Sequence, residues 1–550
     1  MKNFNLAIKD FWNLSADNAF RVNKPGAAIL ISLIAALLFL FLSSVQLDRQ
    51  GLYFDEVHQA TASFNYIDQP SGQFANLKIN GLPVLNMNYS GALKTGIYGL
   101  YLRLTGKRFS VVSWRLVGLI FVSIALLLFG VILRKIIPPA GLICFYFLTI
   151  TDMNLMLTAR HDWGPVALAL ALRIIFIALW AAGELSDKTS AGNTFWLGCL
   201  LGIMLFEKLS SLVLVIPVSL FIILSAKRKN WRYTAAYATG GMIGASPLIY
   251  ANIYTFINQG SFISLQNELI HRVYTLTGFL DAAQEYLALG AGTEAQFFIL
   301  GNGQPVLNQI ELLQVSLLII LMVIGMIRFR KDSHLFRLAG VMLACYAAIM
   351  VSLYFLPQNI WIHHWIIGTP FQYLAVSLVF WGGKDQHKIF RYGFTILLVT
   401  MTLSRLIGLV TVEQSLARGD ASISFDPSYN QLGELAASKA KQAYFIAEDW
   451  GVYNQIICFL NGKPGILFQL NQGSENIDQV VEQLKNGRRT EAYLLFPYHS
   501  VYMTPEKNKL ALDEIERLLG PDWQEQITDE SVRDLKTVNV IKIVRVRSSQ

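Results

Sequence analysis

Residues 25–47 read PGAAILISLIAALLFLFLSSVQL, an uncharged stretch of 23 residues. A helix of this length spans the roughly 30 Å of hydrocarbon in a bilayer. It is too long for the apolar core of a secretory signal and no A-x-A-like cleavage site follows it, so we expect a retained anchor. The next residues, DRQGLYFDEVHQA (48–60), carry several ionisable side chains within about three helical turns of the lipid boundary. The sequence therefore predicts a membrane span that leads directly into a polar segment at the membrane surface.

The composition of the whole chain indicates a membrane protein. Of 550 residues, 53% are hydrophobic and 15% are charged, and the mean hydropathy is +0.42. Soluble domains have about 25% charged residues, so a soluble chain of this composition would expose a large apolar surface to water. The net charge of +8 does not indicate nucleic-acid binding, because the lysines and arginines form short clusters between apolar runs. A soluble enzyme and a nucleic-acid-binding protein are both excluded.

Ten further apolar runs follow the first, and together they predict about eleven membrane spans. They cover residues 110–133, 138–158, 163–182, 194–207, 209–226, 233–256, 311–327, 338–357, 365–381 and 392–411. Basic clusters such as Arg134-Lys135 and 227–229 lie in alternate loops, so these loops and the tail 1–24 are predicted to be cytoplasmic. The outer loops 48–109 and 257–310 are then extracytoplasmic.

The region 412–550 has the pattern of a small extracytoplasmic α/β domain. Asp426-Pro427 is typical of a helix start and predicts a helix to about Lys441. Further on, strand patterns alternate with helical patterns. The strands are expected at 443–448, 465–470, 492–497 and 538–546, and the helices at 477–487 and 507–520. The predicted fold is thus a polytopic α-helical membrane domain over 25–411 with an α/β domain over 412–550.

Ionisable residues cluster at the outer ends of the predicted spans, and such residues are costly near lipid unless they have a function. Asp55 and Glu56 are the first pair. Adjacent carboxylates repel each other, which raises the pKa of one of them and suits it to act as a general base. The alternative is a solvated loop in which Asp55 or Asp48 caps a short helix.

Arg160 and Asp162 lie in LTARHDWGP, where the third span is expected to emerge on the outer side. An arginine beside an aspartate can orient an anionic group, and interfacial snorkelling of the arginine is the alternative. His58 and His161 are of a residue type that binds divalent metals. Their spacing with Asp162 matches no metal-binding motif, so the sequence does not support a metal site.

Two more candidates interrupt apolar segments on the same side. Glu207-Lys208 lies at the outward turn of a predicted helical hairpin, where Lys208 suits a lipid phosphate or forms an ion pair with its neighbour. His363-His364 lies between two tryptophans, where His364 would donate to a phosphate or sugar or belong to an aromatic belt.

Segment 86–118 contains apolar residues at helical spacing with basic residues between them, Lys94 among them. This pattern predicts a helix in the outer membrane interface before the next span. Lys94 is then expected near the Asp55 loop.

In their order along the chain, these motifs resemble those of the GT-C membrane glycosyltransferases, in particular the protein O-mannosyltransferase and lipid A aminoarabinose transferase group. Asp55-Glu56 followed by His58 resembles the acidic pair of the first outer loop of that family. Lys94 and the run 104–116 resemble its interfacial segment, although Thr95-Gly96 stand where the family has two prolines.

Three further motifs carry the resemblance. Arg160 and Asp162 resemble the R-x-D of the family. Lys208, six positions after Gly202, resembles the lysine in the G-x-x-x-x-x-K pattern of the family. The segment AEDWGVYNQIICFLNGKPGILF (447–468) resembles the first part of the periplasmic α/β domain that is often appended to these enzymes.

The resemblance implies an inverting glycosyltransferase that moves a sugar from a polyprenyl-phosphate donor to a hydroxyl of an acceptor protein, lipid or glycan. It implies no required cofactor and a location in the membrane, for which the compact loops favour the bacterial inner membrane. The residues implied are Asp55 as general base with Glu56 and Asp162 in the catalytic group, and Lys94, Arg160, Lys208 and His364 as ligands of the donor phosphate.

Two other classes of protein share the same general layout. A transporter or flippase of lipid-linked glycans would also have many spans, but transporters tend to contain repeated halves with charges near the bilayer midplane, and no repeat is visible here. A non-catalytic assembly protein for envelope polysaccharide would keep the spans and the outer domain without any need for Asp55.

Overall fold

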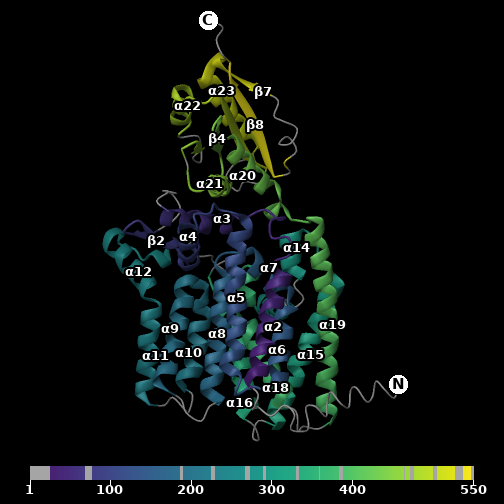
Figure 1. Cartoon of the computed structure of the whole chain (residues 1–550). Coiled ribbons are helices and arrows are strands. Elements are labelled where there is room, and N and C mark those ends of the chain that lie inside the picture. Colours follow the sequence, from purple (N-terminus) through teal and green to yellow (C-terminus); the bar gives the residue numbers. More distant parts are fainter. Residues whose placement is uncertain are drawn as a thin grey trace.

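The computed structural model describes most of the chain. The described residues are 25–67, 77–185, 190–224, 230–266, 273–288, 293–329, 334–357, 360–382, 388–463, 465–470, 476–498, 505–526, 535 and 537–546. The predicted tail 1–24 and the basic cluster at 227–229 lie outside them. The molecule is a bundle of long helices with a small α/β domain at one end (Figure 1).

In the part of the chain that the structure describes, each of the eleven predicted apolar runs coincides with one or two helices of the bundle. In chain order these are α2 (Pro25–Ser43), α5 (Val111–Leu133), α6 (Pro139–Ile150), α7 (Met153–His161), α8 (Val166–Leu185), α9 (Ala191–Glu207), α10 (Leu212–Leu224), α11 (Trp231–Gly244), α12 (Ser246–Gln259), α15 (Pro305–Phe329), α16 (His334–Tyr354), α18 (Thr369–Gly382) and α19 (Lys388–Arg418). Between α12 and α15 lie α13 (Leu276–Ala288) and α14 (Thr293–Leu300). The chain is therefore an integral membrane protein with the predicted polytopic helical fold.

The number of long spans differs from the predicted eleven. Within the described residues, six helices are long and apolar enough to cross a membrane, namely α2, α5, α8, α15, α16 and α19. The run 138–158 is divided into α6 and α7, which are bent by 60° and together form a seventh candidate. The bend arises where Asp152 caps a new helix by accepting a hydrogen bond from the backbone N–H of Leu155 (2.9 Å). Within the described residues, the other predicted runs form helices of 17 residues or fewer.

Small residues allow the closest helix packing in the bundle. Glycines of α9 and α11 lie against the backbone of the other helix. A Cβ at Gly198 of α9 would lie 2.0 Å from the carbonyl oxygen of Tyr237 in α11. Close backbone approach of this kind is typical of helix pairs in membranes, where dispersion rather than water exclusion holds helices together.

The first outer loop folds against the end of the bundle that faces the α/β domain (Figure 1). It contains α3 (Phe54–Ala62), a short 3-10 helix η1 (Ser63–Ile67), an antiparallel sheet of β1 (Leu77–Ile79), β2 (Leu82–Met87) and β3 (Ser90–Gly91), and α4 (Leu93–Thr105). The predicted interfacial helix is α4. Its residues Leu93, Ile97, Leu100 and Leu104 are exposed, while Lys94 is buried, which is the arrangement of a helix with one face toward lipid.

The C-terminal domain has a five-stranded sheet of order β5-β4-β6-β8-β7. The four predicted strands are β4 (Ala443–Ala447), β5 (Leu467–Gln469), β6 (Glu491–Pro497) and β8 (Val538–Arg545), and the predicted helices are α20 (Ser428–Lys439), α22 (Ile477–Asn486) and α23 (Pro505–Leu519). β5, β4 and β6 are parallel, and β8 joins β6 antiparallel. The sequence did not predict the polar edge strand β7 (Trp523–Gln526) or the helix α21 (Trp450–Phe459). The predicted domain boundary at 411 lies inside α19, which continues to Arg418.

Helix α21 packs directly on α3. The rings of Phe54 and Trp450 lie 5.3 Å apart, and a Cβ at Gly451 would lie 2.5 Å from the ring of Phe54. The side chain of Asn430 on α20 donates to the carbonyl of Asp48 (3.1 Å) and accepts from the backbone N–H of Leu52 (3.3 Å). The C-terminal domain therefore fixes the segment that carries Asp55.

Candidate functional site

Asp55 lies in the first turn of α3, at the end of the bundle that carries the C-terminal domain (Figure 1). It is half-buried, and among the described residues its carboxylate has no hydrogen-bond partner. Burial raises the pKa of Asp55, and the positive charge of Lys208 acts in the opposite direction. Asp55 does not cap the helix, since the backbone N–H of Tyr53 donates to Glu56 instead (3.1 Å). The structure thus leaves Asp55 available for chemistry.

Lys208 follows α9 and is held in place by the hairpin of the first outer loop. The backbone N–H of Leu209 donates to the carbonyl of Tyr89 (2.9 Å). Lys208 is 6% exposed, and its Nζ donates to the carbonyl of Trp163 (3.3 Å). Gly164 leaves space for this ammonium, because a Cβ there would lie 2.6 Å from Nζ. In the described ranges no carboxylate lies within ion-pair distance of Lys208.

The charge of Lys208 connects several of the predicted residues. It interacts electrostatically with Asp55 and Asp162, and it acts on both His363 and His364. These residues come from four different segments of the chain, so only the folded protein brings them together. The cluster of Asp55, Lys208 and the two histidines is called the Asp55 site below.

Lys94 and Asp162 form an ion pair with each other, and both side chains are completely buried. The ammonium of Lys94 also lies 3.7 Å from the ring centroid of Trp114. The second oxygen of Asp162 accepts a hydrogen bond from the backbone N–H of Ala167 (2.8 Å) near the start of α8. The pair therefore joins α4 to the start of α8 through opposite charges in the interior.

Glu56 and Arg115 form a second buried pair, with two hydrogen bonds of 2.8 and 2.9 Å. Arg115 also donates to the carbonyls of Leu47, Gln50 and Gly51 (2.7 to 2.9 Å). A bidentate pair of this kind fixes geometry as well as charge. Glu56 therefore holds the connection between α2 and α3 in position, next to Asp55 in the sequence.

Arg160 has a similar task at the end of α2. Its guanidinium donates to the backbone carbonyls of Ser43 (3.1 Å), Val45 and Gln46 (2.5 Å). The last carbonyls of a helix have no hydrogen-bond donors within the helix, and here the guanidinium of Arg160 donates to them. Its buried charge is thus used to close the C-terminus of α2.

Glu207 and Lys208 do not form an ion pair with each other, although they are adjacent. The carboxylate of Glu207 accepts hydrogen bonds from the backbone N–H groups of Leu93 (3.1 Å) and Lys94 (3.3 Å), at the start of α4. It acts as an N-cap supplied by a distant part of the chain. Glu207 therefore positions α4, while Lys208 interacts electrostatically with Asp55.

Aromatic rings surround the histidines. Trp163 stacks on Phe298 with ring centroids 4.0 Å apart, and the ring of His363 lies 5.1 Å from that of Trp163. Nδ1 of His364 accepts a hydrogen bond from the backbone N–H of Trp361 (3.0 Å), which fixes its neutral tautomer with Nε2 as the donor. His364 is thereby oriented as a neutral hydrogen-bond donor at the Asp55 site.

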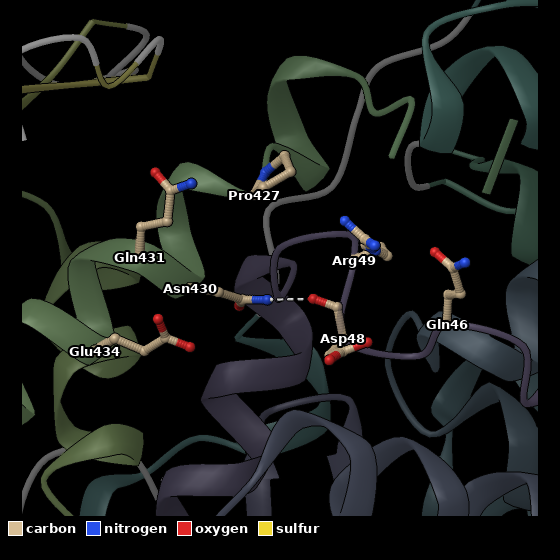
Figure 2. A pocket seen from close by; sticks show the side chains of 7 residues that line it. All are labelled: Gln46, Asp48, Arg49, Pro427, Asn430, Gln431 and Glu434. Atoms are coloured by element: carbon tan, nitrogen blue, oxygen red, sulfur yellow. Dashed lines mark hydrogen bonds between the residues drawn. The ribbon is translucent and has the colours of Figure 1, made fainter. Parts of the chain in front are cut away.

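A shallow polar pocket of about 480 Å³ lies between the connection after α2 and helix α20 (Figure 2). Its lining residues are Gln46, Asp48, Arg49, Pro427, Asn430, Gln431 and Glu434. Amide and charged side chains predominate, and the side chain of Asn430 donates to the carbonyl of Asp48 (Figure 2). The pocket lies where the two domains meet, and none of its lining residues belongs to the Asp55 site.

Sequence reasoning overlooked Arg173, which is 2% exposed in the middle of α8. The only signal was a single arginine in an apolar run, and such a residue is a functional candidate by default. Within the described parts of the chain, no three His, Cys, Asp or Glu side chains are grouped as metal ligands.

The helical bundle, the helix α4 at its end and the α/β domain next to the Asp55 site make up the fold of the chain. Two crystal structures of ArnT, the lipid A aminoarabinose transferase, from Cupriavidus metallidurans share it. The apo structure is 13% identical with a TM-score of 0.58, and the structure bound to undecaprenyl phosphate is 12% identical with a TM-score of 0.60. Both comparisons cover 95% of this chain and 98% of the other. No protein-family model and no curated protein sequence matches. The predicted resemblance is confirmed at the level of the fold.

Proposed function

We propose that the chain is a glycosyltransferase that moves a sugar from a polyprenyl-phosphate donor to an acceptor hydroxyl. The observation that carries this proposal is the state of Asp55 and Lys208. Most of the buried ionisable side chains described near the first outer loop have a counter-ion or several hydrogen bonds to backbone groups. Asp55 and Lys208 interact electrostatically, yet neither has an ion-pair partner among the described residues.

The proposed step assigns one task to each of these residues. Asp55 accepts the proton of the acceptor hydroxyl while the oxygen of that hydroxyl attacks the anomeric carbon of the sugar. The bond from that carbon to the phosphate oxygen breaks with inversion, and its electron pair stays on the lipid phosphate. Lys208 stabilises the phosphate, and His364 donates to it from Nε2.

The shared fold supports the choice of donor, because the related ArnT structure was determined with undecaprenyl phosphate bound. The other predicted residues take supporting roles in this proposal. Glu56, Lys94, Arg160 and Asp162 position the backbone around Asp55 and Lys208 through their buried pairs and carbonyl contacts. We further propose that the Asp55 site and the C-terminal domain lie outside a bacterial inner membrane and that the N-terminus is cytoplasmic.

The test is transfer from radiolabelled polyprenyl-phosphate sugars by purified protein in lipid. Asp55→Asn should lower turnover by about 10² to 10⁴-fold, the usual contribution of a general base. A matched control is Asp513→Asn, which removes an exposed carboxylate of α23 and should leave turnover unchanged.

Two outcomes would contradict the proposal. Normal turnover by folded Asp55→Asn would remove Asp55 from the reaction. Absence of turnover by the folded wild type with every donor would favour the transporter or assembly-protein interpretation.

A further inference from the structure

Arg173 reaches toward the Asp55 site from within the membrane domain. It lies seven residues after Val166, about 10 Å along the axis of α8 from the start of that helix. Its Nε donates to the carbonyl of Ala169 (3.1 Å), four residues earlier. A side chain that bonds the carbonyl at i−4 runs toward the N-terminal end of its helix. That end follows Trp163 and Gly164, which contact Lys208.

The guanidinium of Arg173 is not neutralised by the protein. In the part of the chain that the structure describes, the bond to Ala169 is its one hydrogen bond, and no carboxylate lies within ion-pair distance. The other fully buried arginines of the described ranges differ in this respect. Arg115 and Arg405 each have a glutamate partner, and Arg160 contacts three backbone carbonyls. A buried cation without a counter-charge is costly, so a site that retains one is suited to an anion.

Arg173 and Lys208 act on the same groups. The charge of Arg173 interacts with Lys208 and with both His363 and His364. The two cations therefore act on the histidine pair from different elements, Lys208 from the end of α9 and Arg173 from within α8.

We propose that Arg173 is a second cationic ligand of the lipid phosphate, contacting it from the membrane side while Lys208 contacts it from the outer side. This inference rests on the proposed function. The donor is a phosphodiester with one negative charge. When its bond to the sugar breaks, the phosphate becomes a monoester that carries up to two charges, since the second pKa of a phosphate monoester is about 6. Lys208 balances the charge of the donor, and Arg173 balances the charge that develops as the sugar leaves.

The experiment measures binding of undecaprenyl phosphate and of its methyl diester to purified protein in discs of zwitterionic lipid at pH 8. The wild type should bind the dianionic monoester more tightly than the diester. Arg173→Gln should weaken monoester binding by about 10-fold or more, the effect of one charge-assisted hydrogen bond, and leave diester binding within about 2-fold. Arg337→Gln is the matched control, because it removes an exposed arginine from α16 and should change neither affinity.

If Arg173→Gln does not fold, the pH dependence of lipid binding by the wild type tests the same inference. From pH 5 to pH 8 the affinity of the wild type for the monoester should rise as the second ionisation occurs, while the affinity for the diester should follow no such rise. Equal affinities for the two lipids, or equal loss of both in Arg173→Gln, would overturn the inference. Failure of the wild type to bind either lipid would instead contradict the proposed function.

Discussion

Lys94 and Asp162 lie 68 residues apart and form a completely buried ion pair, and Asp162 also interacts electrostatically with Lys208 of the Asp55 site. Glu207 also contacts this turn of α4, because its carboxylate accepts a hydrogen bond from the backbone N–H of Lys94 (3.3 Å). The first outer loop, the start of α8 and the end of α9 are thereby joined at one point. This joint sets where Lys208, the next residue after Glu207, lies relative to Asp55.

Removal of one member of the Lys94 and Asp162 pair should destabilise the protein strongly. Asp162→Asn leaves an uncompensated buried ammonium and should cost about 3 to 5 kcal/mol of unfolding free energy. The double variant Lys94→Met with Asp162→Asn should recover a large part of that loss, because no buried charge remains. Thermal and denaturant unfolding in detergent measure both effects. A double variant no more stable than either single variant would show that the pair is not coupled.

Transfer should depend on pH through Asp55. Burial raises the pKa of this carboxyl and Lys208 opposes the shift. Because the base must be deprotonated, kcat/KM should fall tenfold per pH unit below the pKa of Asp55 and level off above it. Lys208→Met removes the opposing positive charge, so the residual activity of that variant should titrate at a higher pH than the wild type. An unshifted profile in Lys208→Met would contradict the electrostatic contact between the two residues.

Gly164 should be intolerant of any side chain. Its φ is +74° and a Cβ would lie 2.6 Å from Nζ of Lys208. Gly164→Ala should therefore displace the ammonium and reduce transfer by at least 10-fold, in addition to a backbone penalty of about 1 to 2 kcal/mol. Gly106→Ala separates the two effects, since that residue has a φ of +62° but no atom within 4 Å of the position of a Cβ. Gly106→Ala should lose stability but keep its activity per folded molecule. Equal losses of activity in Gly106→Ala and Gly164→Ala would contradict the role of Gly164 in placing the Lys208 ammonium.

Glu56 should behave as a positioning residue. Glu56→Gln leaves the buried guanidinium of Arg115 without a counter-charge and should lower the unfolding free energy by about 3 to 5 kcal/mol. The pH profile of its remaining activity should match that of the wild type, because Asp55 stays in place. A flat profile would instead assign Glu56 a share in proton transfer.

The residues of the candidate site were predictable to different extents. Asp55 and Lys208 are conspicuous in the sequence because each interrupts or follows an apolar segment on the same side of the membrane. Lys94 and Arg160 are equally conspicuous, and the sequence predicts the same phosphate-binding role for them. Only the tertiary contacts distinguish the two groups, because Lys94 has Asp162 as partner and Arg160 has the carbonyls that end α2.

Local pattern also limits what could be predicted of the fold. The helix α21 is buried over most of its length and shows no amphipathic period, and β7 is a short polar edge strand. Both escaped prediction for that reason. The predicted run 138–158 is one apolar stretch, but Asp152 begins a new helix inside it, and the resulting bend places Arg160 at the end of α2.

The sequence by itself determined that the chain is a polytopic membrane protein with an α/β domain after the last span, because apolar run length and strand alternation are local properties of the chain. The tertiary structure decided which ionisable residues are neutralised and which remain available. Charge neutralisation depends on distance in space, and partners such as Lys94 and Asp162, or Glu207 and the start of α4, are far apart in sequence. The Asp55 site is what remains after those buried pairs have formed.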